Sequence, residues 1–275
     1  STSSLTFIFC QLLHYNATSS LKIHMATLPE HADPNHVLHR VHNLYSGSPD
    51  PTTNAWLTKY IELDQPNVWR TLLEIFVAPA NSVVTNTARF FAVQGLLLKV
   101  SSRHKQGTDV WLHCAPDVRG RLLPSVFHVL TTTRNLDPLV GRRLVLLLCH
   151  LVLRVGRTEE WPTPFVDIFR AFDAPPLKAW LVEFLTVLPY ELEAHSYNKG
   201  ERKSELNTRV RTYVLPRVLH QSELMLTHGD EQEIQAAWKL LCGWCSCSAA
   251  VMRGTPLLMW VSSSSSSNSN SSSSS

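Results

Sequence analysis

Three cysteines lie close together near the C-terminus, and their spacing is the feature of this sequence that most suggests chemistry. Cys242, Cys245 and Cys247 are placed as in a zinc knuckle or a redox motif. A structural zinc site needs four ligands, typically from two knuckles, and no second Cys or His pair lies at a suitable spacing. We therefore predict that these cysteines pack inside the fold as small apolar residues and that the chain holds no metal.

Histidines form a second group of chemically interesting residues. His36, His39 and His42 recur at steps of three, but no carboxylate or thiol completes a ligand set, so we expect a solvated helix face. His150 lies inside a strongly apolar run, which predicts a core histidine whose ring nitrogens find hydrogen bonds.

No catalytic constellation is present. The chain lacks the P-loop, dinucleotide-binding, HExxH and GxSxG patterns. The carboxylate pairs Glu159-Glu160 and Glu231/Glu233 fall at predicted helix starts, where acids favour the helix dipole. We predict a protein that is not an enzyme and needs no cofactor.

Composition favours an all-α fold with a core. Of 275 residues, 44% are hydrophobic and 17% charged, Gly is scarce, and the net charge is only +3. That charge does not argue for direct nucleic-acid binding.

The apolar run Leu5–Leu13 is shorter than a membrane span, so no membrane association is expected. The six cysteines form no disulfide framework, which indicates a reducing, intracellular compartment.

The helix that organises the prediction spans Val83–Ser101. Its apolar residues recur at steps of three and four and also cover neighbouring positions, which indicates packed neighbours on more than one side. Only Arg89, Gln94 and Lys99 are left to face water or a partner.

Similar helices are predicted on both sides of it. Pro189 is expected to end the helix Leu177–Leu188, and Asp230 to cap a helix with Ile234, Ala237, Trp238 and Leu241 on its apolar face. The full set of expected helices is Pro34–Tyr45, Thr53–Leu63, Pro66–Phe76, Val83–Ser101, Pro116–Thr133, Leu139–Val155, Trp161–Phe172, Leu177–Leu188, Glu201–Thr227 and Glu231–Ser246.

These helices pair at intervals of roughly 40–45 residues, a period typical of HEAT or armadillo hairpins. The predicted fold is an α-solenoid of about five HEAT-like antiparallel hairpins, stacked in a right-handed superhelical array. We expect residues 34–261 to hold the repeats, residues 1–33 to be an extension with the native start at Met25, and residues 262–275 to be a Ser/Asn low-complexity tail. Apolar residues just before the tail would lack a packing partner, which predicts an N-terminal fragment of a longer array.

Several segments, in order, are similar to the opening of the importin-β (karyopherin-β) nuclear transport receptors. The N-terminal ones are Asn43-Leu44-Tyr45, Pro49-Asp50-Pro51, Ala55-Trp56-Leu57, Asp64-Gln65, Val68-Trp69 and Phe90-Phe91-Ala92-Val93-Gln94 with Lys99-Val100. Leu185-Thr186-Val187-Leu188-Pro189 with Glu191, and Leu241-Cys242-Gly243-Trp244, resemble the transportin-SR and importin-thirteen branch.

The resemblance implies binding without catalysis. Such receptors bind the GTP form of the small GTPase Ran through their N-terminal repeats, bind protein cargo further along, interact with nuclear pore proteins, and shuttle between nucleus and cytoplasm. In the transportin-SR branch the cargoes include Arg-Ser-rich splicing factors. The rival interpretations are a Ran-independent α-solenoid scaffold, the helical accessory domain of an enzyme, and an RNA-binding solenoid.

Candidate Ran-contacting residues are polar side chains on the second helix of each early pair, because those helices line the groove of a solenoid. They are Lys59, Glu62, Gln94, Lys99, Arg142 and Arg143.

Overall fold

The computed structural model describes residues 33–46, 51–63, 65–78, 84–101, 111, 114–133, 136–155, 161–194 and 201–246. Within these ranges the chain is all-α and contains no β-strand, as predicted. The helices are α2 (Pro34–Ser46), α3 (Pro51–Glu62), α4 (Pro66–Val77), α5 (Asn86–Ser101), α6 (Pro116–Thr132), α7 (Pro138–Val155), α8 (Pro164–Phe172), α9 (Lys178–Ala194), α10 (Glu201–Arg209), α11 (Leu215–His228) and α12 (Glu231–Cys245). A 3₁₀ turn, η3 (Pro175–Leu177), precedes α9, and a π-helical segment, η4 (Val210–Val214), joins α10 to α11.

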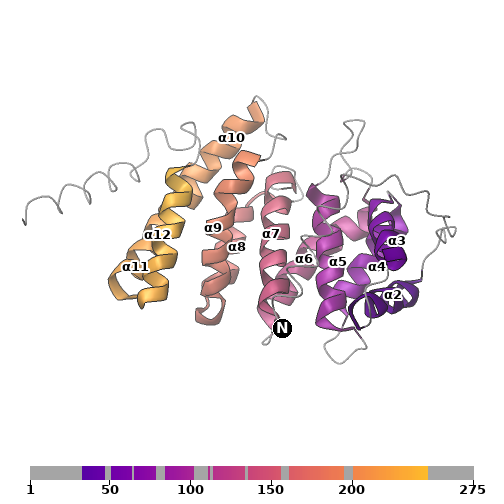
Figure 1. Cartoon of the computed structure of the whole chain (residues 1–275). Helices are drawn as coiled ribbons and strands as arrows, with labels where there is room; N and C mark the ends of the chain where they lie inside the picture. Colours follow the sequence, from indigo (N-terminus) through magenta and orange to yellow (C-terminus); the bar gives the residue numbers. More distant parts are fainter. Residues whose placement is uncertain are drawn as a thin grey trace, which may run out of the picture. The chain divides into compact units, whose positions relative to one another are not determined.

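The helices between Asp33 and Ser246 pack in two rows. In the first row α2 contacts α4, α4 contacts α6, α6 contacts α8, and α8 contacts η4. In the second row α3 contacts α5, and α5, α7, α9 and α12 follow one another. Contacts of α4 with α5, α6 with α7, α8 with α9 and α11 with α12 join the rows. Figure 1 shows α5, α7 and α9 side by side, with α6 and α8 behind them.

Side-chain contacts fix the directions of these helices. The start of α5 lies at the end of α4, where Arg89 bonds to the Ala78 carbonyl, so α4 and α5 are antiparallel. Arg142 of α7 approaches Glu183 of α9, and His150, two turns later, approaches Glu191. Neighbours within the second row therefore run parallel, and helices joined across the rows run antiparallel.

The strongly apolar run around His150 is buried in α7, as its composition predicts. In α7 every residue from Leu147 to Leu153 is at most 4% exposed. α5 packs between α4, α2 and α7, and its Phe91–Leu97 stretch is buried throughout. It begins at Asn86 and not at Val83, because the hydroxyl of Thr85 accepts a hydrogen bond from the Ala88 N–H at 3.2 Å and starts the helix there.

The prediction that Pro189 ends its helix is wrong. α9 continues through Pro189 to Ala194. A proline inside a helix has no N–H to donate to the carbonyl four residues earlier, which here belongs to Leu185. The buried indole N–H of Trp244, on α12, donates to that carbonyl at 2.8 Å. The Trp244 side chain of α12, the neighbour of α9 in the second row, thus supplies the hydrogen bond that the Leu185 carbonyl lacks within its own helix.

The predicted long helix Glu201–Thr227 is present, but it contains a π-helical segment. The Leu215 N–H bonds to the Val210 carbonyl, five residues back, at the end of η4. Pro216 follows directly and would clash with a regular helical turn before it. Widening that turn to π geometry accommodates the proline ring without ending the helix.

α12 begins as predicted, but its buried face is rotated from the expected one. Asp230 accepts from the Glu233 N–H at 2.9 Å, and the Glu233 carboxylate accepts from the Asp230 N–H, which completes a capping box. Ala237, Leu240, Leu241 and Trp244 are buried, whereas Trp238 is 52% exposed. The assignment of Trp238 to the packed face is therefore wrong: α12 turns Trp244 toward α9, and that choice leaves Trp238 in solvent.

Two expectations concern segments outside the described residues. The N-terminal extension before Met25 and the Ser/Asn tail over residues 262–275 lie there, as does Cys247 of the cysteine cluster. Among the helices that the structure describes, none combines the length and apolar character needed to cross a membrane.

Candidate partner-binding surface

The six predicted contact residues lie on three helices of the second row. Lys59 and Glu62 are on α3, Gln94 and Lys99 on α5, and Arg142 and Arg143 on α7. These helices follow one another in the row, so the sequence placed the six residues on neighbouring elements. Burial divides them into two groups with different roles.

Lys99 is directed into the protein. The residue is only 3% exposed, and its ammonium group donates a hydrogen bond to the Leu63 carbonyl at 2.6 Å. Leu63 follows the last residue of α3, where carbonyls lack partners within the helix. The ammonium also lies 5.4 Å from the ring centre of Trp69 on α4, a cation–π distance. Lys99 therefore ties the end of α3 to α4 and α5.

Arg89 has the corresponding role at the other end of α5. Its guanidinium donates to the carbonyl of Ala78, the C-cap of α4, at 2.6 Å, and the residue is 7% exposed. Gln94, between the two, is also 7% exposed. The expectation that Arg89, Gln94 and Lys99 face water or a partner is therefore wrong. Two of the three satisfy helix-end carbonyls of other helices, a demand that the pattern of α5 alone does not reveal.

The other four candidates are exposed or half-buried, so a partner can contact their side chains. Glu62 is exposed and Lys59 half-buried on α3. The Arg142 side chain is 66% exposed and lies 4.0 Å from Glu183 of α9. The Arg143 guanidinium lies 6.0 Å from the ring centre of Phe90, and burial lowers the pKa of this group. Lys59 and Glu62 lie in the last turn of α3, beside the end of α5 that carries Lys99, whereas Arg142 and Arg143 lie near the start of α7, beside Phe90 near the start of α5. The four residues therefore form two separate groups, which we call the α3 charged turn and the α7 arginine pair.

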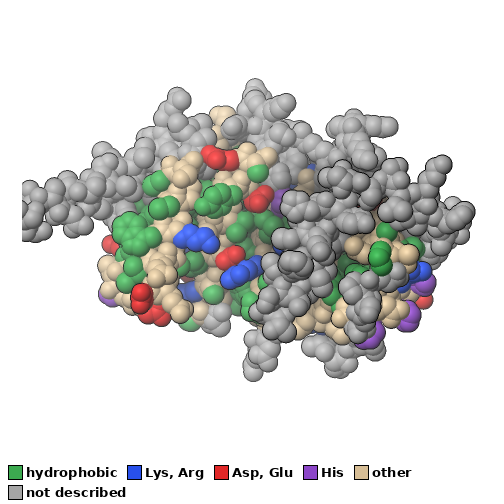
Figure 2. Space-filling model, in the orientation of Figure 1, with side chains coloured by type: hydrophobic (Ala, Val, Ile, Leu, Met, Phe, Trp, Pro, Cys, Tyr) green, Lys and Arg blue, Asp and Glu red, His purple; other side chains and the backbone are tan. Residues whose placement is uncertain are grey.

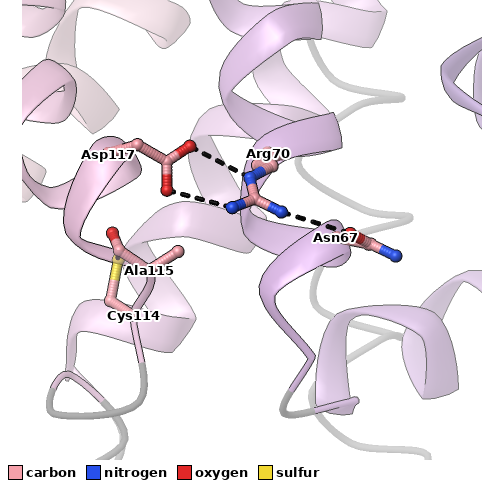
Figure 3. A network of polar contacts seen from close by, with 5 residues as sticks. All are labelled: Asn67, Arg70, Cys114, Ala115 and Asp117. Carbon is pink, nitrogen blue, oxygen red and sulfur yellow. Dashed lines mark hydrogen bonds and ion pairs between the residues drawn. The ribbon is translucent and has the colours of Figure 1, made fainter.

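Sequence reasoning missed the ion pairs that join the first row. Arg70 of α4 contacts Asp117 in the first turn of α6 through two hydrogen bonds, Nε to Oδ2 at 3.0 Å and Nη2 to Oδ1 at 3.1 Å. Its Nη1 donates to Asn67 at 3.5 Å, and Figure 3 shows this fork-shaped contact. The hydrogen bonds from Arg70 lower the pKa of Asp117. Arg217 of α11 donates through Nη2 to Oδ1 of Asp173, which follows α8. Because the residues of each pair are 47 and 44 positions apart, only knowledge of the stacking could have predicted them.

Histidines behave largely as predicted. His150 is 4% exposed, and its Nε2 lies 3.4 Å from Glu191 of α9, so it is a core histidine with a polar neighbour. His36, His39 and His42 are exposed on α2. The Nε2 of His36 accepts a hydrogen bond from Arg40 at 3.2 Å.

The cysteines divide into two kinds. Cys114 and Cys149 are buried free thiols, and burial raises the pKa of Cys149 well above its usual range. Cys242 and Cys245 are exposed free thiols, so the prediction that they pack inside the fold is wrong. The rotation that buries Trp244 leaves their side of α12 in solvent. Among the described residues, no group of three or more His, Cys, Asp and Glu side chains could hold a metal ion.

Large hydrophobic side chains are exposed on the C-terminal helices. They are Tyr190, Tyr213, Leu224 and Trp238. Figure 2 shows hydrophobic side chains on the surface over α9 and α12, with charged side chains among them. This part of the surface is more apolar than the exposed side of α2, which carries His and Arg.

No protein-family model matches this chain, and no curated protein sequence matches it either.

Proposed function

We propose that this chain is the N-terminal part of an importin-β-type nuclear transport receptor of the transportin-SR branch. It binds the GTP form of Ran and takes part in nuclear import of protein cargo, with Arg-Ser-rich splicing factors as the cargo class. It shuttles between cytoplasm and nucleus and interacts with nuclear pore proteins.

The observation that carries this proposal is the two-row packing of antiparallel helix pairs under a sequence that resembles the receptors. Parallel neighbours within a row and antiparallel partners across rows are the arrangement of stacked helical repeats. We extend it to a HEAT-type α-solenoid with a right-handed superhelical array. Solenoids of this kind act through extended binding surfaces and need no catalytic site.

The α3 charged turn and the α7 arginine pair are the two proposed contacts with Ran. Both lie on second-row helices, and they comprise the anion Glu62 and the cations Lys59, Arg142 and Arg143. Exposed charges of this kind raise association rates and set specificity more than they add affinity. Gln94 and Lys99 were candidates for the same contact, but their burial leaves little surface to offer, so the proposal rests on the other four residues.

A binding experiment with matched variants tests these contacts. We expect the full chain to bind Ran loaded with GTP more tightly than Ran loaded with GDP. Charge reversal by Arg142→Glu should weaken binding to the GTP form by about 10-fold or more, mainly through the association rate. Arg121→Glu, on the first-row helix α6, is the control and should leave binding unchanged. Equal binding of the two nucleotide forms would contradict the proposal.

A Ran-independent protein-interaction scaffold is the second candidate function. It is favoured by the role of Lys99, which belongs to the receptor-like motif of α5 and is buried. Lys99 joins α3, α4 and α5 inside the protein, so any stack of helix pairs could retain it for packing alone. The two functions differ in one respect that can be measured, since a scaffold would bind its partners without regard to guanine nucleotide.

A further inference from the structure

Two exposed thiols share the last turn of α12. Cys245 is the last residue of the helix and Cys242 lies three positions before it. The N–H of Ser246 donates to the Cys242 carbonyl at 3.0 Å, and the Ser246 hydroxyl donates to the same carbonyl at 2.9 Å. The turn is therefore held in helical form up to its end. Side chains three residues apart on a helix are neighbours, so the two thiols form one small exposed patch.

Distances decide which chemistry suits this patch. The Cβ atoms of such a pair on a helix are about 5–6 Å apart. A disulfide requires Cβ atoms about 3.5–4.5 Å apart, so an S–S bond would distort the last turn and break its bonds to Ser246. A metal ion with two bonds to sulfur of about 2.3 Å spans sulfur atoms up to about 4.6 Å apart. A bridging cation therefore fits the helical turn better than a disulfide does.

The electrostatics of the helix end point the same way. The C-terminus of a helix carries partial negative charge, which disfavours a free thiolate and favours a cation. Partial burial and the neighbouring Cys242 raise the pKa of Cys245. A thiol that stays protonated is a poor nucleophile and oxidises slowly. A bound cation makes thiolate formation favourable at this helix end, because it replaces the thiol protons and brings positive charge to the negative end of the helix.

We propose that Cys242 and Cys245 form a two-thiolate site for a soft monovalent cation, and that the cation is Cu(I). Thiolates select soft ions, and Cu(I) accepts two of them in a near-linear arrangement. A structural zinc site needs four ligands, which the described residues around this turn do not supply. Binding breaks two S–H bonds, forms two Cu–S bonds and releases two protons, and no electron is transferred. This proposal does not depend on binding to Ran.

A competition titration of the full chain tests the site. The reduced protein would be titrated without oxygen against a coloured Cu(I) chelator, so that the protein's affinity is read from the chelator spectrum. We expect one Cu(I) to bind per chain. Cys242→Ser and Cys245→Ser should each weaken binding by about 100-fold or more, because a single remaining thiolate cannot supply the second bond.

Controls separate this site from other thiols. Cys247→Ser should leave the affinity for Cu(I) unchanged. Cys242→Ser and Cys245→Ser replace exposed residues, so they should leave the helicity measured by circular dichroism unchanged. Below the thiol pKa, each added pH unit should tighten binding by up to about 100-fold, because two protons are released. Failure of the wild-type chain to compete with the chelator, wild-type affinity in Cys242→Ser, or loss of binding in Cys247→Ser would each overturn the proposal.

Discussion

Neighbouring helices within the second row are held together by a different kind of interaction from neighbours within the first row. In the second row, α9 and α12 share the buried bond from Trp244 to Leu185, and α7 contacts α9 through His150 and Glu191 in a nearly dry setting. In the first row, α4 and α6 meet at the exposed Arg70–Asp117 pair, whose side chains are 46% and 49% exposed. Buried polar contacts are costly to break, whereas exposed ion pairs contribute little. Stability should therefore reside in the second row, and the exposed ion pairs should mainly set register.

The largest effect is expected at Trp244. Trp244→Ala removes a fully buried ring and leaves the Leu185 carbonyl without its donor, so it should lower the free energy of unfolding by about 3–5 kcal/mol. Trp244→Phe keeps most of the ring and should cost about 1–3 kcal/mol, chiefly through the lost hydrogen bond. Urea unfolding followed by circular dichroism measures both. If Trp244→Ala lowers the free energy of unfolding by less than about 0.5 kcal/mol, the claim that buried contacts of the second row supply most of the stability is wrong.

A close approach between α7 and α9 should give the next effect. A Cβ placed on Gly141 would lie 2.1 Å from Cη2 of Trp180, so the two helices meet at a position that only glycine allows. Gly141→Ala should destabilise the protein by about 1–3 kcal/mol through overpacking, even though alanine favours helices. The double variant Gly141→Ala/Trp180→Leu provides the test: the added methyl should cost less when the ring is absent. Additive losses would contradict the contact.

Lys99 allows a direct comparison of a buried and a half-exposed lysine. Lys99→Met keeps the length of the side chain but removes the bond to the Leu63 carbonyl, which should cost about 1–3 kcal/mol. Lys59→Met is the matched control on α3 and should change stability by no more than about 0.5 kcal/mol. Equal effects of the two replacements in urea unfolding would show that Lys99 does not join α3 to α5.

The smallest effect is expected at the Arg70–Asp117 pair. Because Arg70 depresses the pKa of Asp117 in the folded state, the pair stabilises the protein above the unfolded-state pKa and loses that contribution as the pH falls through the folded-state pKa. Asp117→Asn should therefore shift the urea midpoint slightly at neutral pH and not at all in strong acid. Added salt should reduce the difference at neutral pH. A shift that persists in acid would exclude this ion pair as its cause.

The helices themselves were largely predictable from the sequence, because the period of apolar residues reports which face of a helix is buried. The apolar run of α7 and the capping signal at Asp230 are examples. What failed were the positions that depend on another helix. Pro189 leaves the Leu185 carbonyl without its helical donor, and that donor comes from Trp244, 59 residues after Leu185 in the sequence.

The candidate surface was less predictable for the same reason. A cation within an apolar helix is assigned to solvent by its type, but Arg89 and Lys99 instead satisfy carbonyls at the ends of α4 and α3. Lys and Arg have long apolar stems that make such burial feasible. Cys242 and Cys245 show the opposite error, since small apolar residues were assigned to the core and lie outside it.

We propose that this stack of helix pairs is a receptor for Ran, and equilibrium binding to the two nucleotide forms of Ran tests this proposal most directly. The full chain would be immobilised and titrated with Ran bound to a non-hydrolysable GTP analogue and with Ran bound to GDP, at the same ionic strength. We predict that the GTP form binds at least about 10-fold more tightly, a difference of about 1.4 kcal/mol. A folded, helical chain that binds neither form, or binds both equally, would contradict the account.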